Sequence, residues 1–284
     1  WEYVEKARRF VREHGDSHFA EGGLGNHFPF IWKVYGIVPA KDYTGLKENQ
    51  PFHDHSQLFE EMESYLNYVK ENNAWNEDQV IQTIKSILNY HIGEPPSKIV
   101  VDGKKMTPLE YFKNVVKIDF DDYVDVMSLM EKPYGQKAEY EVPDNWWRSE
   151  EYYNVELDKF VDMIKKAIKN GYTLYIGGDT GEPGYYAYKD VAMVPTFDIP
   201  SEYIDENARQ FRFCNESTTD DHGIHIVGYK EKDGKYWFLI KDSGSGSRNG
   251  ANKGYNFYHE DYIKLKIMNF TVHKDAVKGF IDIK

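Results

Sequence analysis

The stretch Asp221-His222-Gly223-Ile224-His225-Ile226-Val227-Gly228-Tyr229 decides the fold, because it places a histidine at the start of an apolar strand. After the hairpin signal Asp233-Gly234, a second apolar strand ends at Lys241-Asp242-Ser243. Neighbouring antiparallel strands bring the start of one beside the end of the other. We therefore expect Asp242 to accept a hydrogen bond from Nδ1 of His222, which leaves Nε2 free to act as a base. A hydrogen-bonded histidine without a catalytic role is the alternative.

The chain before these strands is predicted to be helical. Apolar residues recur there at helical intervals. Thr107-Pro108-Leu109-Glu110 combines a capping threonine, a proline at the first helical position and a glutamate at the third, which predicts the start of a short helix. The other predicted helices cover residues 1–15, 28–35, 57–70 and 77–91.

The sequence pattern changes after about residue 119. One more amphipathic helix is predicted at 157–168, among short segments rich in β-branched and aromatic residues. A helical part followed by an antiparallel, β-rich part is an α+β arrangement. We expect a helical lobe over residues 1–118 and a β-rich lobe over residues 119–284. The predicted strands are 172–176, 191–195, 224–229, 236–240, 255–258 and 266–273.

Composition narrows the class of protein. The 284 residues contain 35 Lys and Arg against 47 Asp and Glu, a formal charge of −12. No basic cluster offers a counter-charge to nucleic acid, which argues against such a partner. Hydrophobic residues at 40% and charged residues at 29% are typical of a globular protein. No apolar run approaches the roughly 18 residues of a membrane-spanning helix, so no membrane partner is expected.

Cys214 is the single cysteine, which excludes an intramolecular disulfide and a zinc site made of several thiolates. Although Cys214 lies in the segment leading to His222, we expect it to be packed in the interior, as most cysteines are, rather than to act as a nucleophile. The chain opens at Trp1, already inside a helical pattern. We therefore expect a segment upstream of Trp1, together with any leader peptide.

Motifs along the whole chain resemble, in their order, those of the papain-like cysteine peptidases. The N-terminal ones are Glu21-Gly22-Gly23 and, after a short helix, Tyr35-Gly36-Ile37. The later ones are the His222 strand, the strand ending at Asp242, and Lys253-Gly254-Tyr255. Within these peptidases the chain is most similar to the bleomycin hydrolase and aminopeptidase C branch. Further matches to that branch are residues 35–39, 153–155, 178–179 and 272–277.

The resemblance implies a papain-like fold, with a helical left lobe, a β-rich right lobe and a cleft between them. It makes His222 the catalytic base, Asp242 the residue that orients it, and Gly22 and Gly23 the shelf that binds the substrate backbone. The family usually has Asn followed by Ser-Trp-Gly where this chain has Asp242-Ser243-Gly244-Ser245, so the tryptophan that shields the pair is missing. The charge of Asp242 should favour the imidazolium form of His222.

The nucleophile of this family is a cysteine that precedes the paired glycines by a few tens of residues, so it is expected upstream of Trp1. The resemblance implies a cysteine peptidase of the aminopeptidase C or bleomycin hydrolase type that hydrolyses peptides, requires no cofactor and forms a homo-oligomer. It also implies a cytoplasmic location, unless a leader was removed before Trp1. The alternative, favoured by Asp242 and by the missing tryptophan, is an inactive pseudo-peptidase that binds peptides in the retained cleft.

Two further patterns are given structural interpretations. His53-Asp54-His55 offers three metal ligands, but neighbouring residues rarely converge on one metal. Asp54 or Ser56 is therefore predicted to cap the following helix, and no metal site is expected. The aromatic pairs Trp146-Trp147 and Tyr185-Tyr186 are predicted to line the core and the cleft, with a carbohydrate-binding platform as the alternative.

Overall fold

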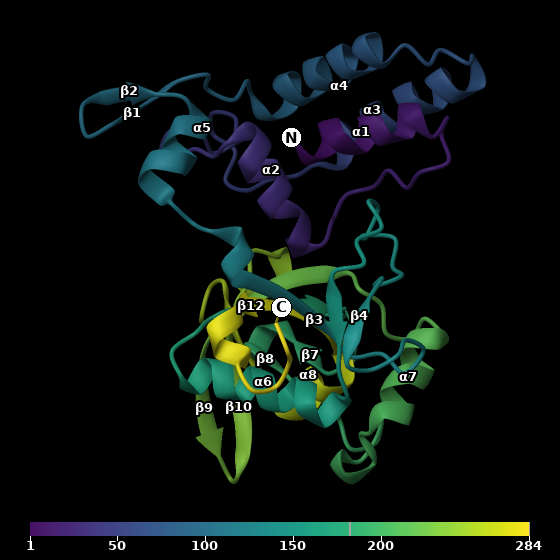
Figure 1. The fold of residues 1–284 in the computed structure, drawn as a ribbon, viewed down its shortest axis with the longest axis vertical. Helices are drawn as coiled ribbons and strands as arrows, with labels where there is room; N and C mark the ends of the chain where they lie inside the picture. The colour runs from purple at the N-terminus through teal and green to yellow at the C-terminus, as the bar shows by residue number, and fades with distance from the viewer. Residues whose placement is uncertain (182, 284) are drawn as a thin grey trace. The chain divides into compact units, whose positions relative to one another are not determined.

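The computed structural model describes residues 1–181 and 183–283, which fall into two compact units (Figure 1). Unit 1 contains Trp1–Gly23 and His27–Asp119. Unit 2 contains Leu24–Asn26 and the chain from Phe120 onward. The two candidate site residues His222 and Asp242 therefore both belong to unit 2, whereas Gly22 and Gly23 belong to unit 1.

Unit 1 is built mainly from helices. In this unit α4 packs against both α1 and α3. The apolar residues that recur at helical intervals form the common core of the three helices. Val80, Ile84 and Leu88 are the examples from α4. The predicted capping box at Thr107 is confirmed, because its side chain accepts from the Glu110 N–H and Glu110 accepts from the Thr107 N–H. The elements are α1 (Glu2–Arg12), α2 (Phe28–Tyr35), α3 (Ser56–Glu71), α4 (Glu77–Ile92), β1 (Ile99–Val101), β2 (Lys104–Met106) and α5 (Pro108–Tyr111).

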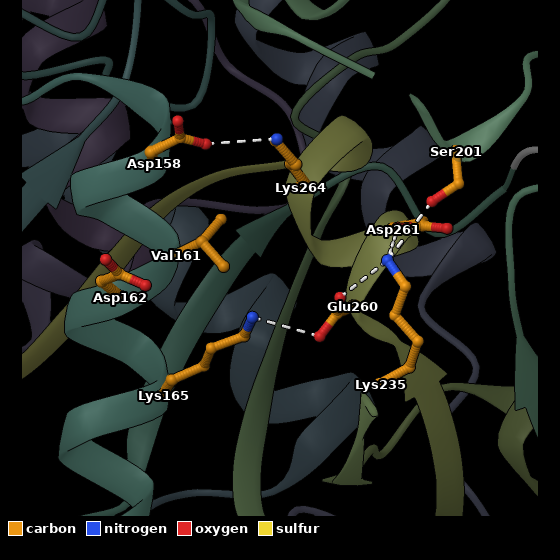
Figure 2. A pocket seen from close by; sticks show the side chains of 9 residues that line it. All are labelled: Asp158, Val161, Asp162, Lys165, Ser201, Lys235, Glu260, Asp261 and Lys264. Atoms are coloured by element: carbon orange, nitrogen blue, oxygen red, sulfur yellow. Dashed lines mark hydrogen bonds and ion pairs between the residues drawn. The ribbon is translucent and has the colours of Figure 1, made fainter. Parts of the chain in front are cut away.

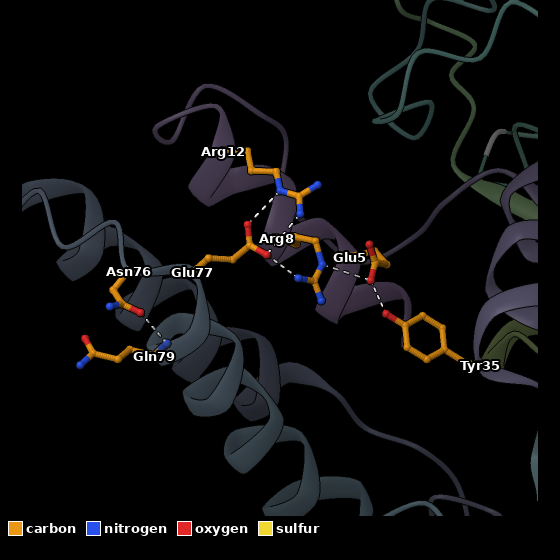
Figure 3. A network of polar contacts seen from close by, with 7 residues as sticks. All are labelled: Glu5, Arg8, Arg12, Tyr35, Asn76, Glu77 and Gln79. Carbon is orange, nitrogen blue, oxygen red and sulfur yellow. Dashed lines mark hydrogen bonds and ion pairs between the residues drawn. The ribbon is translucent and has the colours of Figure 1, made fainter.

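A charged network joins α1 to the first turn of α4 (Figure 3). Glu77 accepts hydrogen bonds from Arg8 and, at 2.9 Å, from Nε of Arg12. Arg8 also contacts Glu5, which accepts from the hydroxyl of Tyr35. The hydrogen bond from Arg12 is the main reason that the pKa of Glu77 lies below its ordinary value of 4.5. Glu77 is also the first residue of α4, where the helix dipole favours a negative charge.

We expect the substitution Glu77→Gln to lower the free energy of unfolding by about 1 kcal/mol at low salt, because it removes the charge that pairs with both arginines. Since the pKa of Glu77 is lowered, its stabilising contribution is present above pH 4.5 and is lost as the pH falls through the lowered pKa. Urea unfolding at pH 7 in low and high salt measures the first effect, and urea unfolding below the lowered pKa of Glu77 measures the second. Glu63→Gln, at an exposed position of α3, is the matched control. Equal losses in the two variants would contradict the prediction.

Unit 2 contains a large, mostly antiparallel sheet, in the order β4-β5-β3-β12-β6-β9-β10-β11-β8-β7. The pairs β3 with β5 and β11 with β8 are parallel. The strand bearing the candidate base, β9, lies between β6 and β10. The strands are β3 (Tyr123–Met127), β4 (Gln136–Ala138), β5 (Tyr152–Asn154), β6 (Leu174–Gly178), β7 (Tyr185–Tyr186), β8 (Val191–Ala192), β9 (His222–Lys232), β10 (Lys235–Lys241), β11 (Tyr255–His259) and β12 (Ile267–His273).

Helices α6 (Leu157–Lys169) and α8 (Glu260–Lys266) pack on this sheet, and α7 (Glu206–Cys214) packs on α8 (Figure 1). The core between helices and sheet is apolar, with Phe160 of α6 against Phe270 of β12 at its centre. The α+β prediction is confirmed, as are the helix at 157–168 and the hairpin at Asp233-Gly234. The elements that were not predicted from the sequence are α7, α8, β1, β2, β3, β4, β5 and β7.

Candidate active site

His222 and Asp242 lie in contact in unit 2. His222 is the first residue of β9, and Asp242 directly follows the last residue of β10. Nε2 of the ring lies 2.8 Å from Oδ1 of Asp242. The prediction that Nδ1 would face Asp242 is therefore wrong. Asp242 lies one residue beyond the pair formed by Lys241 and His225, and its carboxylate meets the outer end of the His222 ring.

The surroundings of Asp242 fix its carboxylate. Its side chain is 4% exposed, whereas that of His222 is 31% exposed. Oδ1 of Asp242 also accepts a hydrogen bond of 2.7 Å from the backbone N–H of Gly244. Oδ1 thus accepts two hydrogen bonds, one from the Gly244 N–H and one from Nε2 of His222. Nδ1 has no hydrogen-bond partner among the described residues, so it is the nitrogen left for chemistry.

The electrostatics of the pair favour two opposite charges. The hydrogen bond to Asp242 raises the pKa of His222 above its ordinary value of 6.5, although burial acts in the other direction. Burial acts to raise the pKa of Asp242, but hydrogen bonds from the His222 ring and from Gly244 outweigh it and hold that pKa below 3.8. The raised pKa of His222 therefore agrees with the expectation that Asp242 favours the imidazolium form.

A cavity of about 230 Å³ opens beside the pair. Tyr185 lines this cavity. A Cβ added to Gly246 would lie 3.1 Å from the Tyr185 ring, so the ring lies against the loop 243–246. This is the loop in which the tryptophan usual in the family is missing. No role was predicted for Thr180, because the pairing of β6 with β9 that brings it beside His222 joins segments distant in sequence. The residues lining the cavity are Thr180, Tyr185, Asp221, His222, Asp242, Gly244, Ser245 and Gly246.

The two glycines predicted to bind substrate lie in unit 1, where the buried Lys6 and the half-buried Glu2 surround their backbone. Lys6, with 0% of its surface exposed, donates to the carbonyl of Gly22 and, at 2.7 Å, to that of Ala20. Gly22 has a φ of 99°, which side-chain-bearing residues rarely adopt. A Cβ at Gly23 would lie 3.1 Å from a carboxylate oxygen of Glu2. Their role in binding substrate stays a prediction.

Cys214 is exposed, so the prediction that it is packed in the interior is wrong. It is the last residue of α7, and its Sγ lies 3.1 Å from Nε2 of Gln210 and 3.8 Å from a carboxylate oxygen of Glu131. Thiols are activated by a helix N-terminus or a neighbouring cation. A helix C-terminus beside a carboxylate offers the opposite surroundings, so Cys214 is poorly placed to serve as the nucleophile.

A second cavity, of about 310 Å³, lies elsewhere on unit 2 (Figure 2). Its lysines face acidic partners: Lys165 and Lys235 bind Glu260, and Lys264 binds Asp158 at 3.2 Å. These ion pairs tie α6, β10 and α8 together. We interpret this cavity as part of the scaffold rather than as a site.

The remaining sequence patterns have structural roles. The N-cap residue of α3 is His55, which makes no side-chain cap, so the prediction that Asp54 or Ser56 is the cap is wrong. Asp54, one residue earlier, accepts a hydrogen bond from the N–H of Ser56, the first residue of α3. Nδ1 of His55 contacts Glu21 at 2.7 Å. Over residues 1–181 and 183–283, no three His, Cys, Asp or Glu side chains are arranged to hold a metal ion. Trp146 is buried against Trp147. In the same part of the chain, no helix is long and apolar enough to span a membrane.

Several known proteins are similar to this chain in sequence. Aminopeptidase C of Lactococcus lactis subsp. cremoris is 23% identical, over 90% of this chain and 64% of that protein, so the chain spans less than two thirds of this relative. Aminopeptidase G of Lactobacillus delbrueckii subsp. lactis is 20% identical, over 94% of this chain and 66% of that protein.

Among solved structures, PepW from Lactobacillus rhamnosis HN001 matches 98% of this chain and 70% of its own, with a TM-score of 0.68 and 18% identity. This match confirms the papain-like α+β fold. A family model described as the peptidase C1-like family matches residues 6–281. The chain therefore belongs to the peptidase C1-like family.

Proposed function

We propose that this chain carries the His222 and Asp242 part of the active site of a papain-like cysteine peptidase of the aminopeptidase C type. The observation that supports the proposal most strongly is the arrangement of the His222 ring. Its Nε2 is held by a buried carboxylate, while Nδ1 is left without a hydrogen-bond partner among the described residues. A base oriented by a third group is the usual partner of a catalytic nucleophile.

In the proposed reaction, His222 moves protons and a cysteine outside these 284 residues supplies the nucleophile. Nδ1 takes the proton of the thiol, and the thiolate attacks the carbonyl carbon of the peptide. The imidazolium then gives this proton to the leaving amine, and a thioester forms. A water molecule, deprotonated by His222, attacks the thioester, releases the acid and restores the thiol. Throughout, Asp242 holds Nε2–H and stabilises the imidazolium.

The alternative is a pseudo-peptidase that binds peptides without hydrolysing them. The sequence Asp242-Ser243-Gly244-Ser245, in place of the usual Asn-Ser-Trp-Gly, favours this alternative. Retention of the His222 and Asp242 contact favours the enzyme. We propose that Gly22 and Gly23 bind the peptide backbone in both cases, because the peptidase and the pseudo-peptidase each bind a peptide.

Labelling of cysteines distinguishes the two functions. In the protein that includes any sequence encoded before Trp1, we expect a peptidyl epoxide to modify a cysteine other than Cys214 and to stop peptide hydrolysis. In the 284-residue chain, iodoacetamide should modify Cys214, which is exposed, and peptides should survive. Mass spectrometry locates each label.

The substitution Cys214→Ser serves as the control and should leave hydrolysis unchanged, because Cys214 is not the proposed nucleophile. If the longer protein is labelled at Cys214 alone and peptides survive, the enzyme proposal fails. Peptide binding without hydrolysis would then support the pseudo-peptidase.

A further inference from the structure

The carboxylate of Asp179 lies beneath the loop that leads into β9. Asp179 directly follows β6 and is 5% exposed. Its Oδ2 accepts a hydrogen bond of 2.9 Å from the N–H of Thr219, and its Oδ1 accepts one of 2.9 Å from the N–H of Gly181. The buried side chain of Asp179 thus joins the loop after β6 to the loop before β9. His222, the first residue of β9, follows Thr219 by three positions.

A second carboxylate makes the reciprocal connection. Oδ1 of Asp221 accepts from the N–H of Thr180 at 3.0 Å, and the N–H of Asp221 donates to the carbonyl of Gly178. Gly178 is also the pairing partner of His222 in the sheet. The segment 218–221 and the segment 178–181 are therefore joined in both directions, directly before the candidate base.

Residues of α8, including its last residue Lys266, contact these two joined segments. The backbone N–H of Asp179 donates to the carbonyl of Lys266, and its carbonyl accepts from the hydroxyl of Tyr262 at 3.0 Å. Nζ of Lys266, a residue 1% exposed, donates to Oγ1 of Thr218 at 3.1 Å. A Cβ at Gly178 would lie 2.3 Å from the Lys266 carbonyl, so glycine is required for this close approach. The junction of segments 178–181 and 218–221 is therefore held against α8 by hydrogen bonds from both Tyr262 and Lys266.

We propose that Asp179 is a positioning residue for His222. Asp179 fixes the segment 218–221, so that the imidazole of His222 meets Asp242. This inference rests on the proposed role of His222 as the base. The carboxylate of Asp179 itself does not touch the ring. Asp242 and Asp221 are the charges that act on the ring, and Asp179 is not among them. The effect of Asp179 on His222 is therefore geometric.

Geometry and charge can be separated with two substitutions of the same residue. Asp179→Ala and Asp179→Asn both remove the charge, but asparagine retains an oxygen that accepts one of the two N–H groups. We expect Asp179→Ala to lower the pKa of the His222 ring by about half a unit or more, because a looser ring makes a poorer hydrogen bond to Asp242. Asp179→Asn should lower it less. In the active protein, kcat should fall about tenfold for Asp179→Ala, with KM within about twofold.

NMR titration of the labelled His222 ring measures the first effect without any peptide, so a failure of the proposed peptidase activity does not disturb this test. Asp162→Asn, which removes an exposed charge of α6, is the control and should leave the titration unchanged. A folded Asp179→Ala protein in which His222 titrates as in the parent would overturn the proposal. If Asp179→Ala does not fold, a folded Asp179→Asn protein that is indistinguishable from the Asp162→Asn control overturns it instead. Equal shifts in the two Asp179 variants would also overturn it, because they indicate a charge effect.

Discussion

Replacing His222 with alanine is expected to reduce kcat for peptide hydrolysis about 10³-fold or more, because the protein loses both the base that forms the thiolate and the acid that protonates the leaving amine. The ring is 31% exposed, so its removal opens no large interior cavity and the fold should persist. Rates of hydrolysis measured with the protein that includes any sequence before Trp1, together with its circular dichroism and Tm, check both statements.

His225→Ala is the matched control for this substitution. His225 lies on the same strand, but its side chain faces the other side of the sheet, and burial lowers its pKa. We expect this variant to retain kcat within a few-fold. Full turnover in a folded His222→Ala protein would remove His222 from the mechanism. A similar loss in both variants would show that the strand, rather than the imidazole, is what matters.

The pairing of His222 with Asp242 could be predicted because it depends on a local hairpin. Asp233-Gly234 fixes the turn between β9 and β10, and the residues next to the far ends of the two strands must then meet. The ring nitrogen that meets Asp242 could not be predicted in the same way. The register of β9 and β10 shifts between Leu239 and Ile240, shortly before Asp242. Such an irregularity bends the strand and changes the direction of the side chains beyond it.

Other features depend on contacts that no local pattern encodes. Helix α8 was not recognised because Tyr262, Ile263 and Leu265 are buried along with the charged Asp261 and Lys266, which leaves no clear polar face. The junction at Asp179 needs the pairing of β6 with β9, which are distant in sequence. Cys214 shows the limit of residue statistics, since cysteines are mostly buried and this one is exposed at a helix end.

Changing Asp242 tests the second element of the proposed site, its charge. Asp242→Asn keeps an oxygen that accepts from Nε2–H of His222 but removes the charge, so we expect the pKa of His222 to fall by about one unit. The alkaline limb of activity, where the imidazolium is lost, should move to lower pH by the same amount. Because asparagine is the residue that the resemblance leads us to expect here, kcat at pH 6 should change little. Asp242→Ala, which removes the orienting oxygen, should reduce kcat about 10²-fold.

The same pair predicts how stability depends on pH. The raised pKa of His222 means that its contribution is fully present below pH 6.5 and is lost as the pH rises through the raised value. The lowered pKa of Asp242 means that its contribution is present above pH 3.8 and is lost as the pH falls through the lowered value. The free energy of unfolding lost in Asp242→Ala should therefore be largest between pH 3.8 and 6.5 and smaller at pH 9. A loss that is the same at all these pH values would mean that Asp242 stabilises the fold through packing and the Gly244 hydrogen bond, and that its charge does not act on His222.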